Sequence, residues 1–256
     1  MQTVCPRPST SAGWAWPWLE RSPYEFRPVD TLRIPESQCV RQAAGVSHEG
    51  GGTAISTIVL RGGIEVDDPL GLAAGFVEAY SNYDSSDHSG PSSFDESDLR
   101  LANRGGARIS AVEISAILER RTQIEAALNG IGPDASLMHA WRAVPWIPLT
   151  QLFDGFADIR GVGFSKMTKA LHRKQPALIP MLDSFVQAYL ATDEPETASG
   201  GSFGERGIAL VRSYKRDLDR NARALRELKS GLSSRGVSLS EVRILDIVIW
   251  SVIAGA

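Results

Sequence analysis

The residues of this 256-residue chain that could do chemistry together lie between Leu152 and Leu190. Among them, Asp183 is a carboxylate at the expected start of a helix, after the break made by Pro176 and Pro180. An isolated Asp at such a position usually accepts the free backbone amides of the first helical turn as an N-cap. A carboxylate held near a reacting sugar can also orient or deprotonate a water molecule. For Asp183 alone, both interpretations stay open.

A glycine turn precedes this carboxylate. Gly161-Val162-Gly163 lies between a helix expected over 149–159 and a second helix that begins at about Phe164. Two glycines around one apolar residue let the backbone bend sharply and leave amides bare at the helix start, where the helix dipole favours an anion. No acid lies between 160 and 174, and the basic residues there are Arg160, Lys166, Lys169, Arg173 and Lys174. The pattern therefore predicts a phosphate-binding hairpin at 152–174.

This segment resembles the helix–hairpin–helix DNA glycosylase superfamily. That family has a hairpin of the form Leu-Pro-Gly-Val-Gly, and a later helix that begins with a Val-Asp-Thr-His-like sequence. The counterparts here are Ile159-Arg160-Gly161-Val162-Gly163 and Leu182-Asp183-Ser184-Phe185. The resemblance is specific over about 40 residues, diffuse over the remaining helices and absent over residues 1–60. The same region is also similar to a bacterial family whose members are uncharacterised.

The resemblance implies that Asp183 is the catalytic carboxylate. Bifunctional members carry a nucleophilic lysine two positions after the second hairpin glycine, where this chain has Ser165, 18 residues before Asp183. The implied activity is that of a monofunctional DNA glycosylase acting on a flipped-out base in double-stranded DNA, without a metal or cofactor. Lys166 and Lys169 remain alternative nucleophiles, and Lys169 is the better one because it shares the helix face of Ser165.

The identity of the excised base stays open between two classes. One class comprises oxidised, alkylated or deaminated bases, and the other comprises deliberately modified bases such as a hypermodified phage cytosine, which would make the protein an antiviral defence enzyme. A non-catalytic helix–hairpin–helix DNA-binding protein is the alternative function, and a helical protein with an unrelated role is a third. Three aromatic residues could stack on the base, although each is also typical of a protein core: Trp141, Trp146 and Phe164.

A basic stripe is expected on a long helix between Gly204 and Lys229. Arg212, Arg216, Arg220 and Arg223 follow one another at spacings of about one helical turn. The stripe is either a solvated helix face with internal ion pairs or a second contact with the DNA backbone.

Composition narrows the remaining classes of function. A formal net charge of −3 excludes a polycation, so nucleic acid would have to bind at a local basic patch. Cys5 and Cys39 are too few thiols for an iron–sulfur cluster or an all-cysteine zinc site. No apolar run approaches the roughly 20 residues of a membrane span. The N-terminus has no basic segment followed by an apolar core. These patterns predict a cytoplasmic protein, and we expect a monomer.

The expected fold is mostly α, a two-lobed helical fold like that of the helix–hairpin–helix glycosylases. An irregular Pro- and Trp-rich arm over 1–60, with one short strand within 53–60, precedes a helical domain over 61–256. The motif Ser110-Ala-Val-Glu113 is a capping box and begins a helix expected to run to Gly130. A second box, Ser202-Phe-Gly-Glu205, begins the long basic helix, which is expected to end near Gly231.

Overall fold

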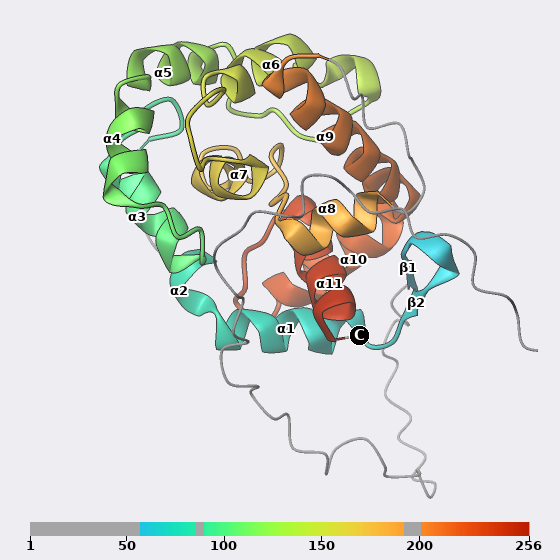
Figure 1. Cartoon of the computed structure of the whole chain (residues 1–256). Helices are drawn as coiled ribbons and strands as arrows, with labels where there is room; N and C mark the ends of the chain where they lie inside the picture. The colour runs from blue at the N-terminus through green and yellow to red at the C-terminus, as the bar shows by residue number, and fades with distance from the viewer. Residues whose placement is uncertain (1–56, 85–89, 192–200, 256) are drawn as a thin grey trace, which may run out of the picture. The chain divides into compact units, whose positions relative to one another are not determined.

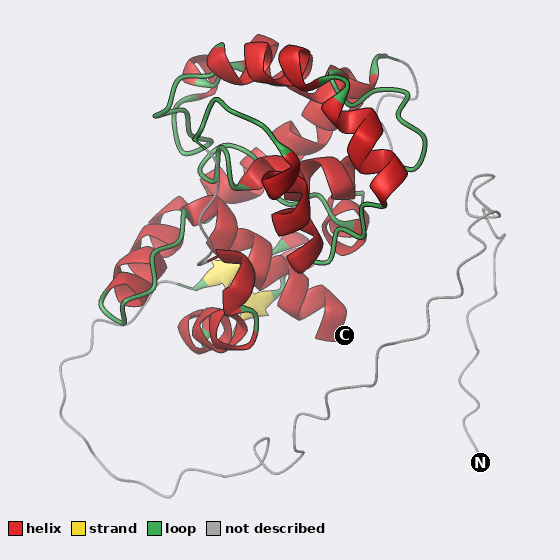
Figure 2. Cartoon of the chain, turned by 90° about the vertical axis from the view of Figure 1, so that its left-hand side faces the viewer, coloured by secondary structure: helices red, strands yellow, loops and turns green. Residues whose placement is uncertain are grey.

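The computed structural model describes residues 57–84, 90–191 and 201–255. The chain divides into two units, residues 1–52 and 53–256, and every described residue belongs to the second unit. The division falls a few residues before the predicted boundary after residue 60, and the arm predicted over residues 1–56 lies outside the described residues. The described chain is mostly helical, as the sequence predicts, with one pair of short strands (Figure 2).

Two strands and a 3-10 turn open the described chain. β1 (Ile58–Val59) and β2 (Glu65–Val66) pair antiparallel, with Ile58 opposite Val66, and η2 (Arg61–Gly63) connects them. The helices that follow are α1 (Pro69–Ala79), α2 (Ser81–Asp84), α3 (Glu96–Arg104), α4 (Ala111–Leu118), α5 (Arg121–Asn129), η3 (Trp141–Ala143), α6 (Trp146–Asp154), α7 (Phe164–His172), α8 (Ser184–Leu190), α9 (Phe203–Arg220), α10 (Ala222–Ser233) and α11 (Glu241–Gly255).

Both predicted capping boxes are present, but each of the long helices they begin is broken in two. The helix that starts after Ser110 ends at Leu118 and resumes as α5, while Asn221 alone separates the end of α9 from the start of α10. The side chain of Asn221 explains the second break. It accepts a hydrogen bond of 2.8 Å from the backbone N–H of Val59 and donates one of 3.0 Å to the Val59 carbonyl. The first strand is thus tied to the turn between α9 and α10.

The helices pack around one large apolar core, and Tyr83, Leu101 and Met181 form a small second cluster. α6 lies against α9 on one side and α5 on the other, α7 lies against α3, and α11 is surrounded by α1, α8 and α10 (Figure 1). The close approach of α9 depends on Gly207, because a Cβ there would lie 2.6 Å from the Phe153 ring of α6. This packing fixes α6 and α7, the two helices on either side of the glycine turn, within the body of the protein.

Candidate functional site

Asp183 is the N-cap of α8. Its backbone is extended, with φ −75° and ψ 179°, and its Oδ1 accepts a hydrogen bond of 3.0 Å from the Val186 N–H. The capping role that the sequence suggested is therefore present. The Asp183 side chain is half-buried, and its Oδ2 makes no hydrogen bond to any described residue. One oxygen of the carboxylate thus remains for a ligand or a water molecule.

Two other helices hold the segment that leads to Asp183. Thr168 of α7 accepts a hydrogen bond of 3.0 Å at its Oγ1 from the Leu182 N–H. Asp246 of α11 accepts one of 3.0 Å at its Oδ2 from the Met181 N–H. These polar groups are all buried, so breaking either bond would leave an unsatisfied donor in the interior. The position of the Asp183 backbone is therefore fixed by α7 and α11 as well as by α8.

Lys169 extends from α7 toward the same region. Burial lowers the pKa of the Lys169 ammonium, the Asp183 carboxylate partly offsets this effect, and the positive charges of Arg243 and Arg108 add to the lowering. The Nζ atom lies 3.9 Å from the position that a Cβ on Gly106 would occupy. Within the described residues the ammonium forms no ion pair or hydrogen bond. Lys169 thus presents a half-buried amine, with an increased neutral fraction, in the electrostatic range of Asp183.

Two ionisable residues of α11, Arg243 and Asp246, make buried polar contacts in this region, and neither was singled out from the sequence. Burial raises the pKa of Asp246 to about 8, although the Met181 amide and the Arg243 charge oppose the rise. Arg243 forms a two-bond contact with Asp84, at 2.9 Å from Nε to Oδ1 and 2.8 Å from Nη2 to Oδ2. The signal available in the sequence was the presence of Arg243 and Asp246 within an otherwise apolar helix. Ionisable groups in the interior require hydrogen-bond partners, an opposite charge or neutralisation, and the partners here lie far away in the sequence.

The two glycines of the turn differ in backbone conformation and surroundings. Gly161 has a left-handed backbone (φ +84°), and a Cβ there would collide with Oε1 of Glu113. Gly163 is the N-cap of α7 with φ −103°, no side chain caps the helix, and a Cβ on it would meet open space. The conformational need for glycine therefore falls on Gly161. The open space in front of Gly163 leaves room for a ligand to approach the first amides of α7.

The basic residues around the turn are less available than the sequence suggested. Lys166 donates hydrogen bonds of 2.7 and 2.8 Å to the two carboxylate oxygens of Glu113, the capping-box residue of α4. Arg173 donates one of 2.8 Å from Nη1 to the Asp84 carbonyl. Arg160 is exposed. Of these three side chains, Arg160 is the one that faces solvent beside the turn.

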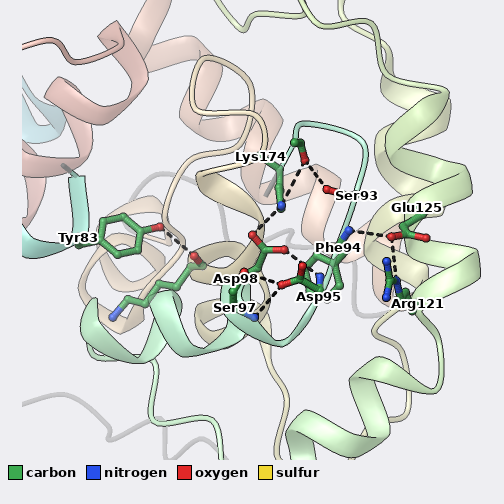
Figure 3. Close-up of polar contacts among 11 residues, drawn as sticks. Tyr83, Ser93, Phe94, Asp95, Ser97, Asp98, Arg121, Glu125 and Lys174 are labelled. Carbon is green, nitrogen blue, oxygen red and sulfur yellow. Dashed lines mark hydrogen bonds and ion pairs between the residues drawn. The ribbon is translucent and has the colours of Figure 1, made fainter. Parts of the chain in front are cut away.

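Lys174 is a buried structural residue, which corrects its assignment as a DNA contact. Its Nζ lies 2.6 Å from Oδ1 of Asp98, and both side chains are almost fully excluded from solvent. Figure 3 shows Lys174 pointing into the group formed by Asp98, Asp95 and Ser93 at the start of α3. Removing either partner of such a buried ion pair would leave an uncompensated charge in the interior and strongly destabilise the fold. The Lys174–Asp98 pair therefore joins α3 to the residues that follow α7.

The three aromatic residues predicted for a base pocket belong to two separate ring pairs, one of which includes Phe203. Trp141 and Trp146 meet edge to face with ring centroids 5.2 Å apart, at the start of α6. Phe164 stacks on Phe203 of α9 with centroids 4.6 Å apart, at the start of α7. Ser165 is half-buried on the first turn of α7. The structure thus joins Thr168 to the residue before Asp183 and places Lys169 within electrostatic range of Asp183, while the predicted aromatic residues contact other partners.

A surface pocket of about 200 Å³ lies between α4 and the residues just before the glycine turn. It is lined by Val112, Glu113, Ala116, Glu119, Arg120, Asp158, Ile159 and Arg160. The lining mixes two arginines with three acids and does not include Asp183. The pocket therefore adjoins the hairpin and is separate from the carboxylate.

Across residues 57–84, 90–191 and 201–255, no three His, Cys, Asp or Glu side chains are grouped as a metal ion would require. Within the same ranges, no helix combines the length and apolar character of a bilayer span.

Comparison with known proteins identifies one protein family. A model described as a family of unknown function (DUF6308) matches residues 74–253, which include the hairpin, Lys169, Asp183 and Asp246. Neither the curated proteins nor the solved structures include a match. Because the matched residues cover well over half of the chain, this protein belongs to the DUF6308 family.

Proposed function

We propose that the protein is a monofunctional DNA glycosylase of the helix–hairpin–helix type, which excises a damaged or modified base and leaves an abasic site. The observation that carries the proposal is the direct connection between the hairpin and the carboxylate. α7 begins at the glycine turn, and its Thr168 accepts the hydrogen bond of the Leu182 amide, the residue before Asp183. A phosphate bound at the start of α7 would therefore lie at a fixed distance from the Asp183 carboxylate.

The Asp183 carboxylate has the chemistry that cleavage of an N-glycosidic bond requires. The bond breaks through a sugar with oxocarbenium character, whose positive charge an adjacent carboxylate stabilises. At about 4 Å and an effective dielectric constant near 20, one such charge pair contributes about 4 kcal/mol, or roughly a thousandfold in rate. The Asp183 oxygen that does not cap α8 is available to orient the attacking water.

The hairpin would supply the grip on the DNA backbone. The uncapped amides of α7 and the exposed Arg160 form the positive part of this surface. The neighbouring Glu113 is neutralised by Lys166, whose hydrogen bonds help to hold the Glu113 pKa below its usual value although burial acts in the opposite direction. The hairpin thus offers a moderate attraction for one phosphate, and a second surface would have to contribute further affinity.

The test is incubation of the full-length protein with double-stranded DNAs that each carry one damaged or phage-modified base, followed by alkali cleavage at abasic sites. Alkali-dependent cleavage of one substrate supports the proposal, and the identity of the base separates a repair enzyme from a defence enzyme. Absence of cleavage on all substrates, together with tight DNA binding, would favour the second candidate below.

A non-catalytic helix–hairpin–helix DNA-binding protein is the second candidate function. The observation that favours it is the hydrogen bond between Asp183 and the Val186 amide, because helix capping alone accounts for an Asp at this position. Under this candidate, the hairpin binds DNA and the replacement of Asp183 by Asn changes neither binding nor any reaction.

A further inference from the structure

The start of α6 carries an exposed surface of aromatic and apolar side chains, at the end of this helix opposite to the hairpin. Trp141 is 42% exposed and Ile147 is 74% exposed. The indole Nε1 of Trp146 donates a hydrogen bond of 2.8 Å to the Trp141 carbonyl, and the two rings meet edge to face. The ring pair is therefore held in place by its own backbone, while part of the Trp141 ring remains open to solvent.

Cationic side chains of α9 lie against both rings. The Arg212 guanidinium is 5.1 Å from the centre of the Trp146 ring, and the Lys215 ammonium is 5.4 Å from that of Trp141. Lys215 is itself committed, because its Nζ donates to the carbonyls of Leu137 and His139 and pairs with Asp219. Lys215 therefore holds the Trp141 ring in place, and its charge is not available to a ligand.

The free charge comes from two arginines. Arg142, next to Trp141, and Arg212 are exposed, and neither forms an ion pair or a hydrogen bond with any residue that the structure describes. Asp219 is an acid that contacts this surface, and its carboxylate is paired with Lys215. The surface thus combines an open aromatic ring with two unneutralised guanidinium groups.

We propose that this surface, made of Trp141, Arg142, Trp146, Ile147 and Arg212, binds an unpaired stretch of a nucleic-acid strand. A base stacks on an open indole whatever its sequence, and guanidinium groups bind the phosphates on either side. An acidic peptide is the other polyanion to consider, and its apolar anchor residues would require a pocket. Here Trp141 and Ile147 project outward, which suits a planar base better than an aliphatic anchor.

The inference goes beyond the proposed excision reaction, because neither Asp183 nor the hairpin takes part in this surface. Trp146 and Asp154 mark the two ends of α6, which spans about 12 Å at the usual helical rise. One bound strand could therefore run from the ring pair along α6 toward the segment that leads to the glycine turn. The ring pair was first expected to form a pocket for the excised base, and its place at the far end of α6 favours a contact with the flanking strand.

The test uses fluorescence anisotropy of full-length protein with a labelled oligothymidylate of about 20 nucleotides and with a duplex of the same length. Trp141→Leu should weaken binding of the single strand at least about fivefold, whereas Trp141→Phe should keep most of it, because a ring is retained. The Trp141 carbonyl that holds Trp146 is present in both variants. Arg212→Gln should weaken binding and reduce its salt dependence by about one counterion.

Arg235→Gln is the matched control, since Arg235 is exposed on the turn after α10 and its loss changes the net charge equally. Three results would overturn the proposal: unchanged single-strand affinity in Trp141→Leu, an equal loss in Arg235→Gln, or equal competition by an oligoglutamate of matched charge. The last result would assign the surface to an acidic protein. Because the measurement is of binding, its outcome is independent of whether the protein excises a base.

Discussion

The Oδ2 atom of Asp246 accepts a hydrogen bond of 3.0 Å from the backbone N–H of Met181, two residues before Asp183. Asp246 lies in the middle of α11 and is buried, and burial raises its pKa to about 8. The carboxyl group is therefore largely protonated near neutral pH. Because the Asp246 carboxyl group holds the Met181 amide, its ionisation would act on the segment that positions Asp183, the candidate catalytic residue.

Asp246 should make the folding stability decrease as the pH rises. Its pKa is raised from 3.8 to about 8 in the folded state, so the folded protein retains a proton that the unfolded chain releases. The contribution of the protonated group is complete below about pH 4 and is lost as the pH rises through about 8. Asp246→Asn keeps an acceptor for the Met181 amide and cannot ionise, so its stability relative to wild type should grow with pH, by at most about 1.4 kcal/mol per pH unit.

Denaturant unfolding of both proteins between about pH 5 and pH 8 measures this difference. His172 is also buried, with a pKa lowered to about 4 by desolvation, and its stability contribution is lost as the pH falls, which is the opposite dependence. It is present in both proteins and cancels in the comparison. A difference between Asp246→Asn and wild type that does not vary with pH would show that Asp246 is ionised in the folded protein.

The two hairpin glycines should respond differently to substitution. Gly161→Ala places a Cβ in a left-handed backbone and against Glu113, so we expect a loss of about 1–3 kcal/mol in the free energy of unfolding. Gly163→Val meets open space and an ordinary backbone region, so its unfolding free energy should stay within about 1 kcal/mol of wild type while its DNA affinity falls. Thermal unfolding and DNA-binding anisotropy give the two readouts. Unchanged DNA affinity in a folded Gly163→Val protein would mean that the turn is only structural.

Glu113 should oppose DNA binding at the hairpin. Glu113→Gln can still accept the hydrogen bond of the Ser110 amide in the capping box, but it removes a carboxylate beside Gly161 and releases the Lys166 ammonium. We expect the affinity for duplex DNA to rise several-fold, with a steeper dependence on salt. The matched control is Glu96→Gln, which removes an exposed carboxylate from α3. Equal effects of the two substitutions would attribute the gain to net charge alone.

The protein should leave an abasic site without cutting the strand. A strand cut without added base requires an amine that attacks C1′. Ser165 stands at the position that supplies this amine in the bifunctional glycosylases that the segment resembles. Borohydride treatment during turnover should therefore trap no covalent protein–DNA adduct, and Ser165→Lys should gain strand cleavage. Lys169 is the residue that could contradict this expectation, because its amine has a lowered pKa and lies in the electrostatic range of Asp183. An adduct that disappears in Lys169→Ala would identify Lys169 as the nucleophile.

Local sequence signals predicted the starts of several elements. Asp183, Ser110 and Ser202 each cap the helix that they were expected to begin, because a capping side chain bonds to amides only two or three residues away. The turn at Gly161 was predicted for the same reason, since its backbone geometry is a property of the glycine itself.

Contacts between residues far apart in the sequence could not be predicted from such local signals. The sequence places Lys174 among the basic residues beside the hairpin, which predicts an exposed side chain. In the structure Lys174 is buried, because it pairs with Asp98, which lies far earlier in the chain. Lys166 likewise meets Glu113 across 53 residues of sequence, and Asn221 breaks a predicted helix by binding the backbone of Val59. In each case the partner is set by tertiary packing, and no periodicity or composition of a single segment contains that information.

The proposal that the Asp183 carboxylate breaks a glycosidic bond in DNA is tested by comparing base excision by wild type and Asp183→Asn on the same modified duplex. Asn keeps the side-chain oxygen that caps α8 at the Val186 amide, so the fold should persist and can be verified by circular dichroism. We predict alkali-sensitive abasic sites with wild type and a loss of roughly a thousandfold in rate with Asp183→Asn. Excision by the folded Asp183→Asn protein at the wild-type rate would contradict the assignment.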